Sequence, residues 1–184
     1  MSGNTQIIPP DEIQSVIEKL AAEVTDRHKA TENLAIIAIA DGGIPLANLL
    51  GQCIRQSLGR KIAVGSVDIS FHRDDLGRNP IPKPSSPTEI PVEMDGANIL
   101  LVDDVLFTGR SARAAINEIF DLGRPGHIEL VILFDRGGRK LPIHPDYSGF
   151  QQQLSTDSLV EVHIDPDNPD NHSIRTTKDS KESA

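Results

Sequence analysis

The sequence predicts a single α/β domain built on a mostly parallel sheet, with helices covering both faces. Three observations support this fold class. Helical and strand-like hydrophobic patterns alternate along the chain. Two runs, residues 34–40 and 99–102, are apolar without interruption, as expected of strands buried on both faces. With 184 residues, of which 38% are hydrophobic, the chain is long enough for one core.

The expected elements follow one another in a regular order. Apolar residues at helical spacing predict a first helix that is capped by Asp11 and extends to Val24. The other expected elements are strand 34–40, helix 46–58 ending at Gly59, strand 62–69, strand 99–102, helix 111–122, strand 129–134 and strand 160–164. Helix 111–122 is expected to bury Ile116, Ile119 and Phe120. Because ligands bind at the carboxyl ends of parallel strands, the turns after these strands are the places to look for a site.

Two segments interrupt this order. Residues 72–96 are rich in proline and charge, which predicts a long loop or two-stranded arm that acts as a lid. After Asp165 the chain becomes polar. We therefore expect a domain spanning residues 10–165 and a flexible C-terminal tail at 166–184.

Composition narrows the possible functions. The formal net charge of −9 disfavours unspecific coating of nucleic acid or anionic membranes, and the six aromatic residues (five Phe, one Tyr) are too few for a base-stacking platform. Cys53 is the only cysteine, which excludes an internal disulfide, and the six histidines show no metal-ligand spacing. The apolar runs are too short to span a bilayer, so we expect a soluble, cytoplasmic protein.

Residues 99–111 form the most informative stretch, ILLVDDVLFTGRS. A buried strand ends in two carboxylates, Asp103 and Asp104, and a helix begins after Thr108 and Gly109. Backbone N–H groups and hydroxyls at a helix N-terminus suit a phosphate. The carboxylates would repel phosphate, but they suit hydroxyl groups or a Mg²⁺ ion that holds phosphates. A ribose 5-phosphate has both chemical features.

This stretch resembles the signature of type I phosphoribosyltransferases, which bind phosphoribosyl pyrophosphate (PRPP). Residues 67–76, 121–125, 135–137 and 141–143 are further similar to the PyrR family of bifunctional proteins, which combine pyrimidine-operon attenuation with uracil phosphoribosyltransferase activity. The resemblance extends over residues 10–165. It implies conversion of uracil and PRPP into UMP and pyrophosphate, Mg²⁺ as cofactor, and a homodimer or larger homo-oligomer.

The resemblance also assigns roles to individual residues. It implies that Asp103 and Asp104 hold the ribose hydroxyls and, through Mg-PRPP, the metal. The residues expected to wrap the 5-phosphate are Val105, Leu106, Phe107, Thr108, Gly109, Arg110 and Ser111. Those expected to face pyrophosphate are Asp41, Gly42 and Gly43. Arg136 and Val160 are expected near the base. We add two inferences: Arg73 on the lid closes over pyrophosphate with a catalytic role, and Tyr147 helps to roof the base pocket.

The resemblance further implies UMP-promoted binding of pyrimidine-operon leader mRNA. Candidate RNA contacts are the basic residues Lys19, Arg27, Arg139 and Lys140. The sequence departs from RNA-binding members of the family in having Glu18 and Ala22 on the first helix, and from many members in having Asp41-Gly42 where they have Thr-Arg.

Two alternatives remain open at the level of sequence. The first is a non-catalytic RNA-binding regulator that uses the PRPP/UMP site only as a sensor. The second is a phosphoribosyltransferase for a purine base.

Overall fold

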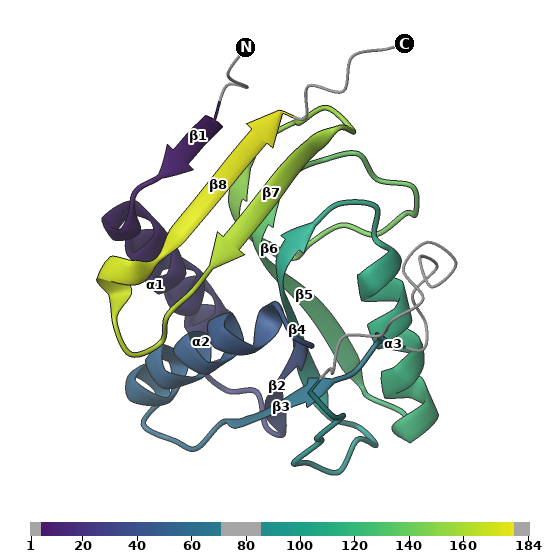
Figure 1. Ribbon diagram of the computed structural model, residues 1–184. Coiled ribbons are helices and arrows are strands. Elements are labelled where there is room, and N and C mark those ends of the chain that lie inside the picture. Colours follow the sequence, from purple (N-terminus) through teal and green to yellow (C-terminus); the bar gives the residue numbers. More distant parts are fainter. Residues whose placement is uncertain (1–4, 71–85, 179–184) are drawn as a thin grey trace.

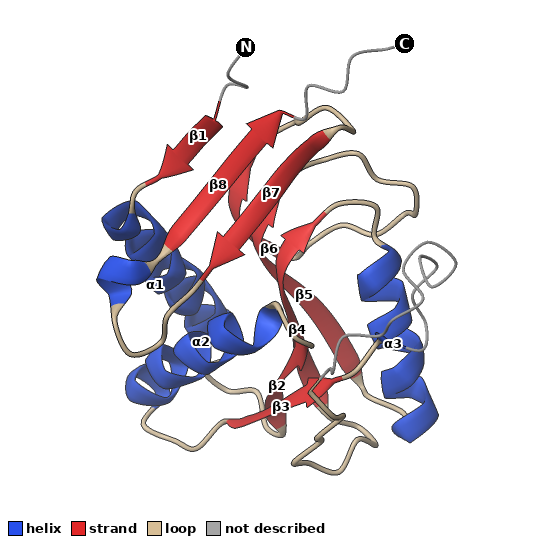
Figure 2. Ribbon diagram, in the orientation of Figure 1, coloured by secondary structure: helices blue, strands red, loops and turns tan. Residues whose placement is uncertain are grey.

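The computed structural model describes residues 5–70 and 86–178, and within these ranges it shows the expected α/β architecture. Five parallel strands form the central sheet in the order β3-β2-β4-β5-β6. Figures 1 and 2 show α1 and α2 on one face of this sheet and α3 on the other. The strands are β2 (Leu34–Ile39), β3 (Ala63–Val67), β4 (Asn98–Leu106), β5 (His127–Asp135) and β6 (Tyr147–Gln151), and the helices are α1 (Pro10–Arg27), α2 (Gly43–Leu58) and α3 (Arg110–Leu122).

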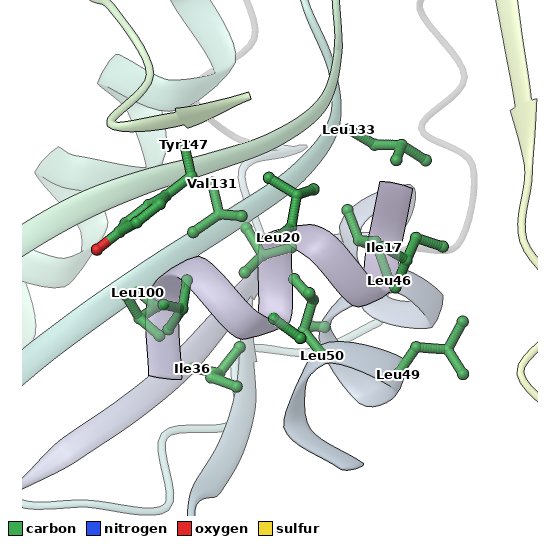
Figure 3. Close-up of a cluster of buried hydrophobic side chains, with 14 of the residues drawn as sticks. Ile17, Leu20, Ile36, Leu46, Leu49, Leu50, Leu100, Val131, Leu133 and Tyr147 are labelled. Carbon is green, nitrogen blue, oxygen red and sulfur yellow. The ribbon is translucent and has the colours of Figure 1, made fainter. Parts of the chain in front are cut away.

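The sheet separates two hydrophobic cores because alternate side chains of each strand point to opposite faces. In β2, Ile36 and Ala38 join the core beneath α1 and α2, whereas Ile37 and Ile39 join the core beneath α3. Figure 3 shows the first core, in which the labelled residues are Ile17, Leu20, Ile36, Leu46, Leu49, Leu50, Leu100, Val131, Leu133 and Tyr147. All six residues of β2 are buried, as its continuous apolar pattern predicts.

The strand order places a topological switch point between β2 and β4. From β2 the chain passes through α2 to β3 on one side, and it then returns to form β4 on the other side of β2. At such a point the connections leave in opposite directions and open a crevice at the carboxyl ends of the strands. The turn after β2 (residues 40–42) and the turn after β4 (residues 107–109) both lie at this edge.

A second, antiparallel sheet forms a hood beside this edge and corrects the prediction for the C-terminus. Its strands, in the order β1-β8-β7, are β1 (Thr5–Ile8), β8 (Ser173–Lys178) and β7 (Ser158–His163). Within the segment expected to be a flexible tail, residues 166–178 are therefore ordered, and β8 is the central strand of the hood (Figure 1). The sequence concealed this strand because Ile174 is its one strongly apolar residue. Its buried and exposed positions nevertheless alternate as a half-buried strand requires.

Several local expectations also need correction. Asp11 lies in the first turn of α1 rather than at its cap, which is Pro9. Phe120 is exposed on α3, whereas Ile119 is buried and Ile116 is partly buried. The expected strand at 62–69 is shorter, and the strand at 129–134 begins earlier, at His127. No helix among the described residues is long and apolar enough to cross a membrane.

Candidate functional site

Two helix N-termini meet the crevice at the switch point, and both are suited to anions. Neither α2 nor α3 has a side-chain cap or an acidic residue in its first turn. By contrast, α1 carries Asp11 and Glu12 in its first turn. Uncapped first-turn N–H groups and the positive end of the helix dipole favour negative ligands. The geometry therefore provides two anion-binding positions, one after β2 and one after β4.

The acidic pair lies between these positions, on β4. Asp103 is buried, and its Oδ1 accepts a hydrogen bond from the Asp104 amide at 3.0 Å. Asp104 is half-buried, and its Oδ1 accepts from the Val105 amide at 2.8 Å. Burial, together with the neighbouring Asp104 charge, raises the pKa of Asp103 well above its ordinary value, and burial also raises the pKa of Asp104. Two carboxylates held this close suit a cation or hydroxyl donors.

The turn after β2 packs directly against this pair. A Cβ atom on Gly42 would lie 2.7 Å from both carboxylate oxygens of Asp104, and one on Gly43 would lie 2.3 Å from the carbonyl oxygen of Val102. The Ala40–Asp41 peptide bond is cis, and the exposed Asp41 side chain accepts a hydrogen bond from the Ser86 amide at 2.9 Å. Glycines are thus required here because the turn and the acidic strand approach so closely. An anion at the start of α2 would be adjacent to the acidic pair.

The loop after β4 presents backbone donors to the second position. Carbonyl oxygens of Leu106, Phe107 and Thr108 all accept hydrogen bonds from residues 136–141. In a trans peptide unit the C=O and the following N–H point in opposite directions, so the N–H groups of Phe107, Thr108 and Gly109 point away from that segment. Within the described ranges these three N–H groups have no acceptor. Gly109, with φ +88°, then leads into α3. These backbone donors are of the kind that the predicted phosphate cradle requires, and phosphate binding by them stays a prediction.

Arg110 and Ser111, which the sequence assigns to the same cradle, are exposed in the first turn of α3. The Thr108 hydroxyl accepts from the Arg110 amide at 3.3 Å. The two side chains therefore lie where a bound anion could reach them.

Arg136 lies behind the cradle. Its guanidinium carbon is 4.0 Å from the centre of the Phe107 ring, and one of its terminal nitrogens donates to the Ser155 carbonyl at 2.9 Å. A Cβ atom on Gly138 would lie 2.5 Å from a carbon atom of the Phe107 ring. The side chain of Arg136 is buried, which lowers its pKa, and its Nε has no partner among the described residues. Arg136 therefore ties the cradle to the segment after β6; its expected contact with a base remains a prediction.

The other two expected base-site residues lie in different parts of the fold, and the expected contact of Val160 with the base stays a prediction. Val160 lies on β7 in the hood and packs, half-buried, against the first core. Tyr147 is at the beginning of β6, beside Val131 and away from the carboxyl edge, so its expected place in the base pocket is wrong. Arg73 lies outside the described residues.

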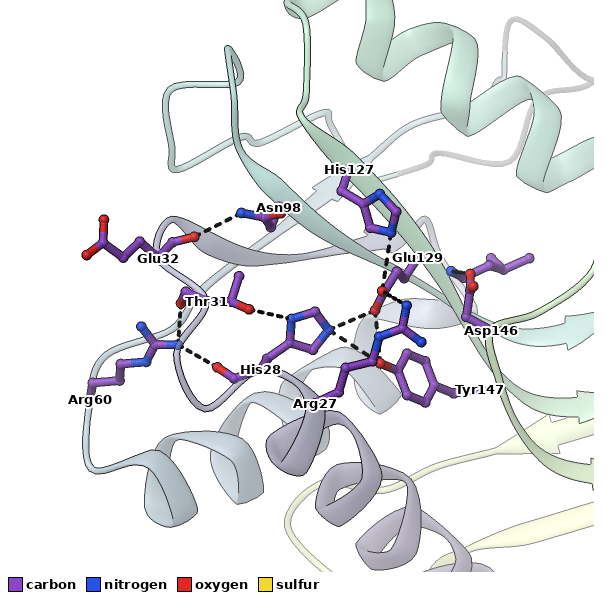
Figure 4. A network of polar contacts seen from close by, with 11 residues as sticks. Arg27, His28, Thr31, Glu32, Arg60, Asn98, His127, Glu129, Asp146 and Tyr147 are labelled. Atoms are coloured by element: carbon purple, nitrogen blue, oxygen red, sulfur yellow. Dashed lines mark hydrogen bonds and ion pairs between the residues drawn. The ribbon is translucent and has the colours of Figure 1, made fainter.

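Tyr147 instead belongs to a polar network at the opposite end of the sheet (Figure 4). Buried Glu129 accepts hydrogen bonds from His28 at 2.7 Å and from Tyr147 at 2.9 Å, and it pairs with Arg27 at 2.7 Å. Burial alone would raise the pKa of Glu129. The hydrogen bonds from His28 and Tyr147, with the positive charges of His28 and Arg27, outweigh burial, so the pKa of Glu129 is lowered. Burial also raises the pKa of Tyr147. The network satisfies a buried carboxylate and connects α1 to β5 and β6.

The four candidate RNA contacts differ in availability. Arg27 is paired with Glu129, but 54% of its side chain is exposed, so it remains available at the surface. Arg139 is mostly buried in internal hydrogen bonds, which makes it a poor surface contact. Lys140 is exposed, and Lys19 is exposed with a 3.8 Å ion pair to Glu23. The basic segment 136–140 therefore offers less free positive charge than its sequence indicates.

Comparison with known proteins defines the class of this protein. A family model described as "Phosphoribosyl transferase domain" matches residues 6–167. A hypoxanthine-guanine phosphoribosyltransferase of Bacillus anthracis has a similar structure, with a TM-score of 0.62 at 18% identity over 87% of each chain. A hypoxanthine phosphoribosyltransferase of Trypanosoma cruzi gives a TM-score of 0.62 at 17% identity over 85% of each chain. The protein thus has the phosphoribosyltransferase fold.

Curated relatives define the family more narrowly. The "Bifunctional protein PyrR" of Microcystis aeruginosa is 42% identical over 159 residues, which are 86% of this chain and 89% of the relative. The protein of the same name from Chloroflexus aurantiacus is 39% identical over 165 residues, 89% of this chain and 90% of the relative. The chain belongs to the PyrR family of phosphoribosyltransferases.

Proposed function

We propose that this protein transfers the phosphoribosyl group of PRPP to N1 of uracil, with release of pyrophosphate. The observation that carries the proposal is the acidic pair on β4 between two uncapped helix N-termini. PRPP has the same order of groups: a pyrophosphate, a ribose diol and a 5-phosphate. Relatives named PyrR at about 40% identity support uracil as the base.

The reaction forms a bond between ribose C1 and uracil N1 and breaks the bond from C1 to the pyrophosphate oxygen. The N1 proton passes to solvent, and the electron pair of the broken C1–O bond leaves with pyrophosphate. Positive charge develops on the ribose ring during this step, close to the carboxylates of Asp103 and Asp104. The N–H groups at the start of α2 stabilise the negative charge that grows on pyrophosphate. The cradle after β4 binds the 5-phosphate, which does not react, and so holds PRPP in the site.

Asp103 and Asp104 also fit Mg²⁺. Among the described residues no group of three or more metal-binding side chains comes together. Mg²⁺ characteristically binds through one or two carboxylates and the phosphates of its substrate, so the pair suits an ion that arrives with PRPP. When bound, the ion would neutralise charge on the leaving pyrophosphate.

The test is formation of UMP and pyrophosphate from uracil, PRPP and Mg²⁺. Asp103→Asn/Asp104→Asn should lower turnover by about 100-fold or more because it removes the charges next to the reacting ring. The matched control, Asp26→Asn/Asp157→Asn, changes two exposed carboxylates and should leave turnover unchanged. If the acidic-pair variant keeps activity within a few-fold of the unsubstituted protein, the assigned roles are wrong.

Competition between bases tests the substrate class. Uracil should outcompete hypoxanthine and guanine as acceptor at equal concentrations. If a purine is preferred, the protein is a purine phosphoribosyltransferase. If UMP binds tightly but no base turns over, the site is a sensor.

We further propose that the protein binds pyrimidine-operon leader RNA, as a bifunctional family member. One observation connects the surface around Lys140 with the nucleotide site: the amides of Lys140 and Leu141 both donate to the Thr108 carbonyl in the cradle. Exposed Lys140 thus adjoins the loop that holds the 5-phosphate. A leader hairpin should bind in a salt-dependent manner, more tightly with UMP present, and absence of any UMP effect would contradict this proposal.

A further inference from the structure

Arg139 occupies the point where β4 and β5 separate at the carboxyl edge of the sheet. The last pair in the register of these strands joins Leu106 to Asp135. Beyond it, one chain continues into the phosphate cradle and the other into the loop of residues 136–146. The Arg139 side chain lies between the two, with 15% of its surface exposed.

The guanidinium of Arg139 uses all three of its nitrogens. Its NH1 nitrogen donates to the Phe107 carbonyl at 2.8 Å and, more weakly, to the Leu106 carbonyl at 3.4 Å. Its Nε donates to the Ile143 carbonyl at 3.0 Å, and its NH2 nitrogen pairs with Asp135 at 2.5 Å. One planar group thus fixes the end of β5, the following loop and the cradle together.

These contacts determine the direction of the cradle N–H groups. Arg139 holds the Phe107 carbonyl and reinforces the Leu106 carbonyl, which also accepts from the Arg136 amide at 3.1 Å. The opposite ends of these peptide units, the N–H groups of Phe107 and Thr108, are therefore directed away from Arg139. The next peptide unit is fixed at the Thr108 carbonyl, which accepts hydrogen bonds from the Lys140 and Leu141 amides at 3.0 and 3.2 Å. Three successive peptide planes are therefore fixed from behind.

We propose that Arg139 is a positioning residue that preorganises the backbone N–H groups for the 5-phosphate. The role rests on the proposed function, because that function supplies the phosphate. Arg139 touches no substrate in this role. It acts through the Leu106 and Phe107 carbonyls, and Asp135 acts through Arg139.

The role predicts a specific kinetic pattern. The 5-phosphate does not react, so its contacts stabilise the ground state and the transition state about equally. Arg139→Met should therefore raise the Kd for UMP and the KM for PRPP by about tenfold and leave kcat within about threefold. Arg139→Lys keeps the charge but not the planar fork, so its Kd for UMP and KM for PRPP should lie between those of the unsubstituted protein and those of Arg139→Met.

Pyrophosphate binding is the readout that distinguishes this positioning role from a merely structural one. Mg-pyrophosphate is expected at the start of α2, on a different turn, so its Kd should stay unchanged in the Arg139 variants. Arg124→Met is the matched control: Arg124 follows the other end of α3, where its side chain donates to the carbonyls of Phe120 and Gly123, and the Kd for UMP should stay unchanged.

Calorimetric titration of each purified variant with UMP and with Mg-pyrophosphate tests the proposal. Selective weakening of UMP binding supports it. An unchanged UMP affinity in Arg139→Met, or an equal loss of UMP and pyrophosphate binding, overturns it. If Arg139→Met does not fold, Arg139→Lys and Asp135→Asn give the same comparison. Failure of the unsubstituted protein to bind either UMP or PRPP would instead overturn the proposed function on which the role rests.

Discussion

Replacing Asp103 by asparagine should stabilise the ligand-free protein although it removes activity. Asp103 is 8% exposed, and within the described part of the chain no cation lies beside it. Its neighbour Asp104 adds a second negative charge, and burial raises the pKa of Asp103. Ionised Asp103 therefore costs folding free energy, whereas asparagine keeps an oxygen that can accept from the Asp104 amide.

The magnitude follows from the surroundings of the pair. Full desolvation of an unpaired carboxylate costs several kcal/mol, but Asp104 is only half-buried, which places Asp103 near the crevice and its water. We expect Asp103→Asn to gain about 1–2 kcal/mol at neutral pH. In a chain of this length, 1 kcal/mol shifts Tm by about 2–4 °C, which gives an increase of about 2–8 °C.

The gain should depend on pH in a defined direction. A raised pKa means that the native state binds the Asp103 proton more tightly than the unfolded state does. The unsubstituted protein therefore gains stability as pH falls through the raised pKa, and the advantage of the asparagine variant shrinks. Asp165 provides a control in which the pKa shift has the opposite sign, because hydrogen bonds from Asn171 and the Asp167 amide lower the pKa of this carboxyl.

Thermal unfolding of ligand-free protein at about pH 8 and about pH 5 measures both effects. Asp165→Asn should not raise Tm at either pH, because the lowered pKa of Asp165 favours its ionised form in the native state. A lower Tm for Asp103→Asn at pH 8, or an advantage over the unsubstituted protein that does not shrink in acid, would refute this reasoning.

Three further predictions concern other parts of the molecule. Glu129→Ala leaves buried polar partners without their acceptor, so the free energy of unfolding in denaturant should fall by about 3–5 kcal/mol, and Tyr147→Phe should lower it by about 1 kcal/mol. The KM for PRPP should stay unchanged in both variants; a changed KM in Tyr147→Phe would mean that Tyr147 belongs to the site. Gly43→Ala would place its Cβ 2.3 Å from the Val102 carbonyl, so kcat/KM for PRPP should fall at least about tenfold, and near-normal kinetics would show that the turn is not tightly packed. Lys140→Ala should reduce the slope of leader-RNA affinity against salt by about 1, as loss of one phosphate contact requires, and an unchanged slope would remove Lys140 from the interface.

The sequence predicts β2, β4 and β5 of the central sheet because these strands are largely buried on both faces, whereas the half-buried edge strand β6 is not expected from the sequence. A continuous apolar run such as β2 has few other structural interpretations, and the turns at its carboxyl end follow from the parallel arrangement. The hood is not predictable in the same way. Strands β1 and β8 are short and half-polar, and they are far apart in sequence although they pair along Thr5–Ile8 and 174–177. Their stability comes from tertiary pairing rather than from local pattern.

The site shows the same division. Asp103, Asp104 and the loop that follows are recognisable because charge and glycine at the end of a buried strand have few structural reasons to occur together. The prediction for Tyr147 is wrong because the sequence pattern does not predict β6, so it cannot place Tyr147 at the beginning of that strand, away from the site. The sequence predicts Arg139 to be a surface cation for RNA because a basic run carries no sign of burial. Its partners Phe107 and Asp135 become visible only in three dimensions.

A structure of the protein with UMP bound tests the central claim most directly. The account predicts that phosphate oxygens lie about 3 Å from the amide nitrogens of Thr108 and Gly109 and that the ribose hydroxyls face Asp103 and Asp104. The opposite end of the sheet offers an alternative position, a basic cavity of about 620 Å³ whose lining includes Arg55, Arg60 and Lys61. UMP bound there, with the acidic pair unliganded, would contradict the account.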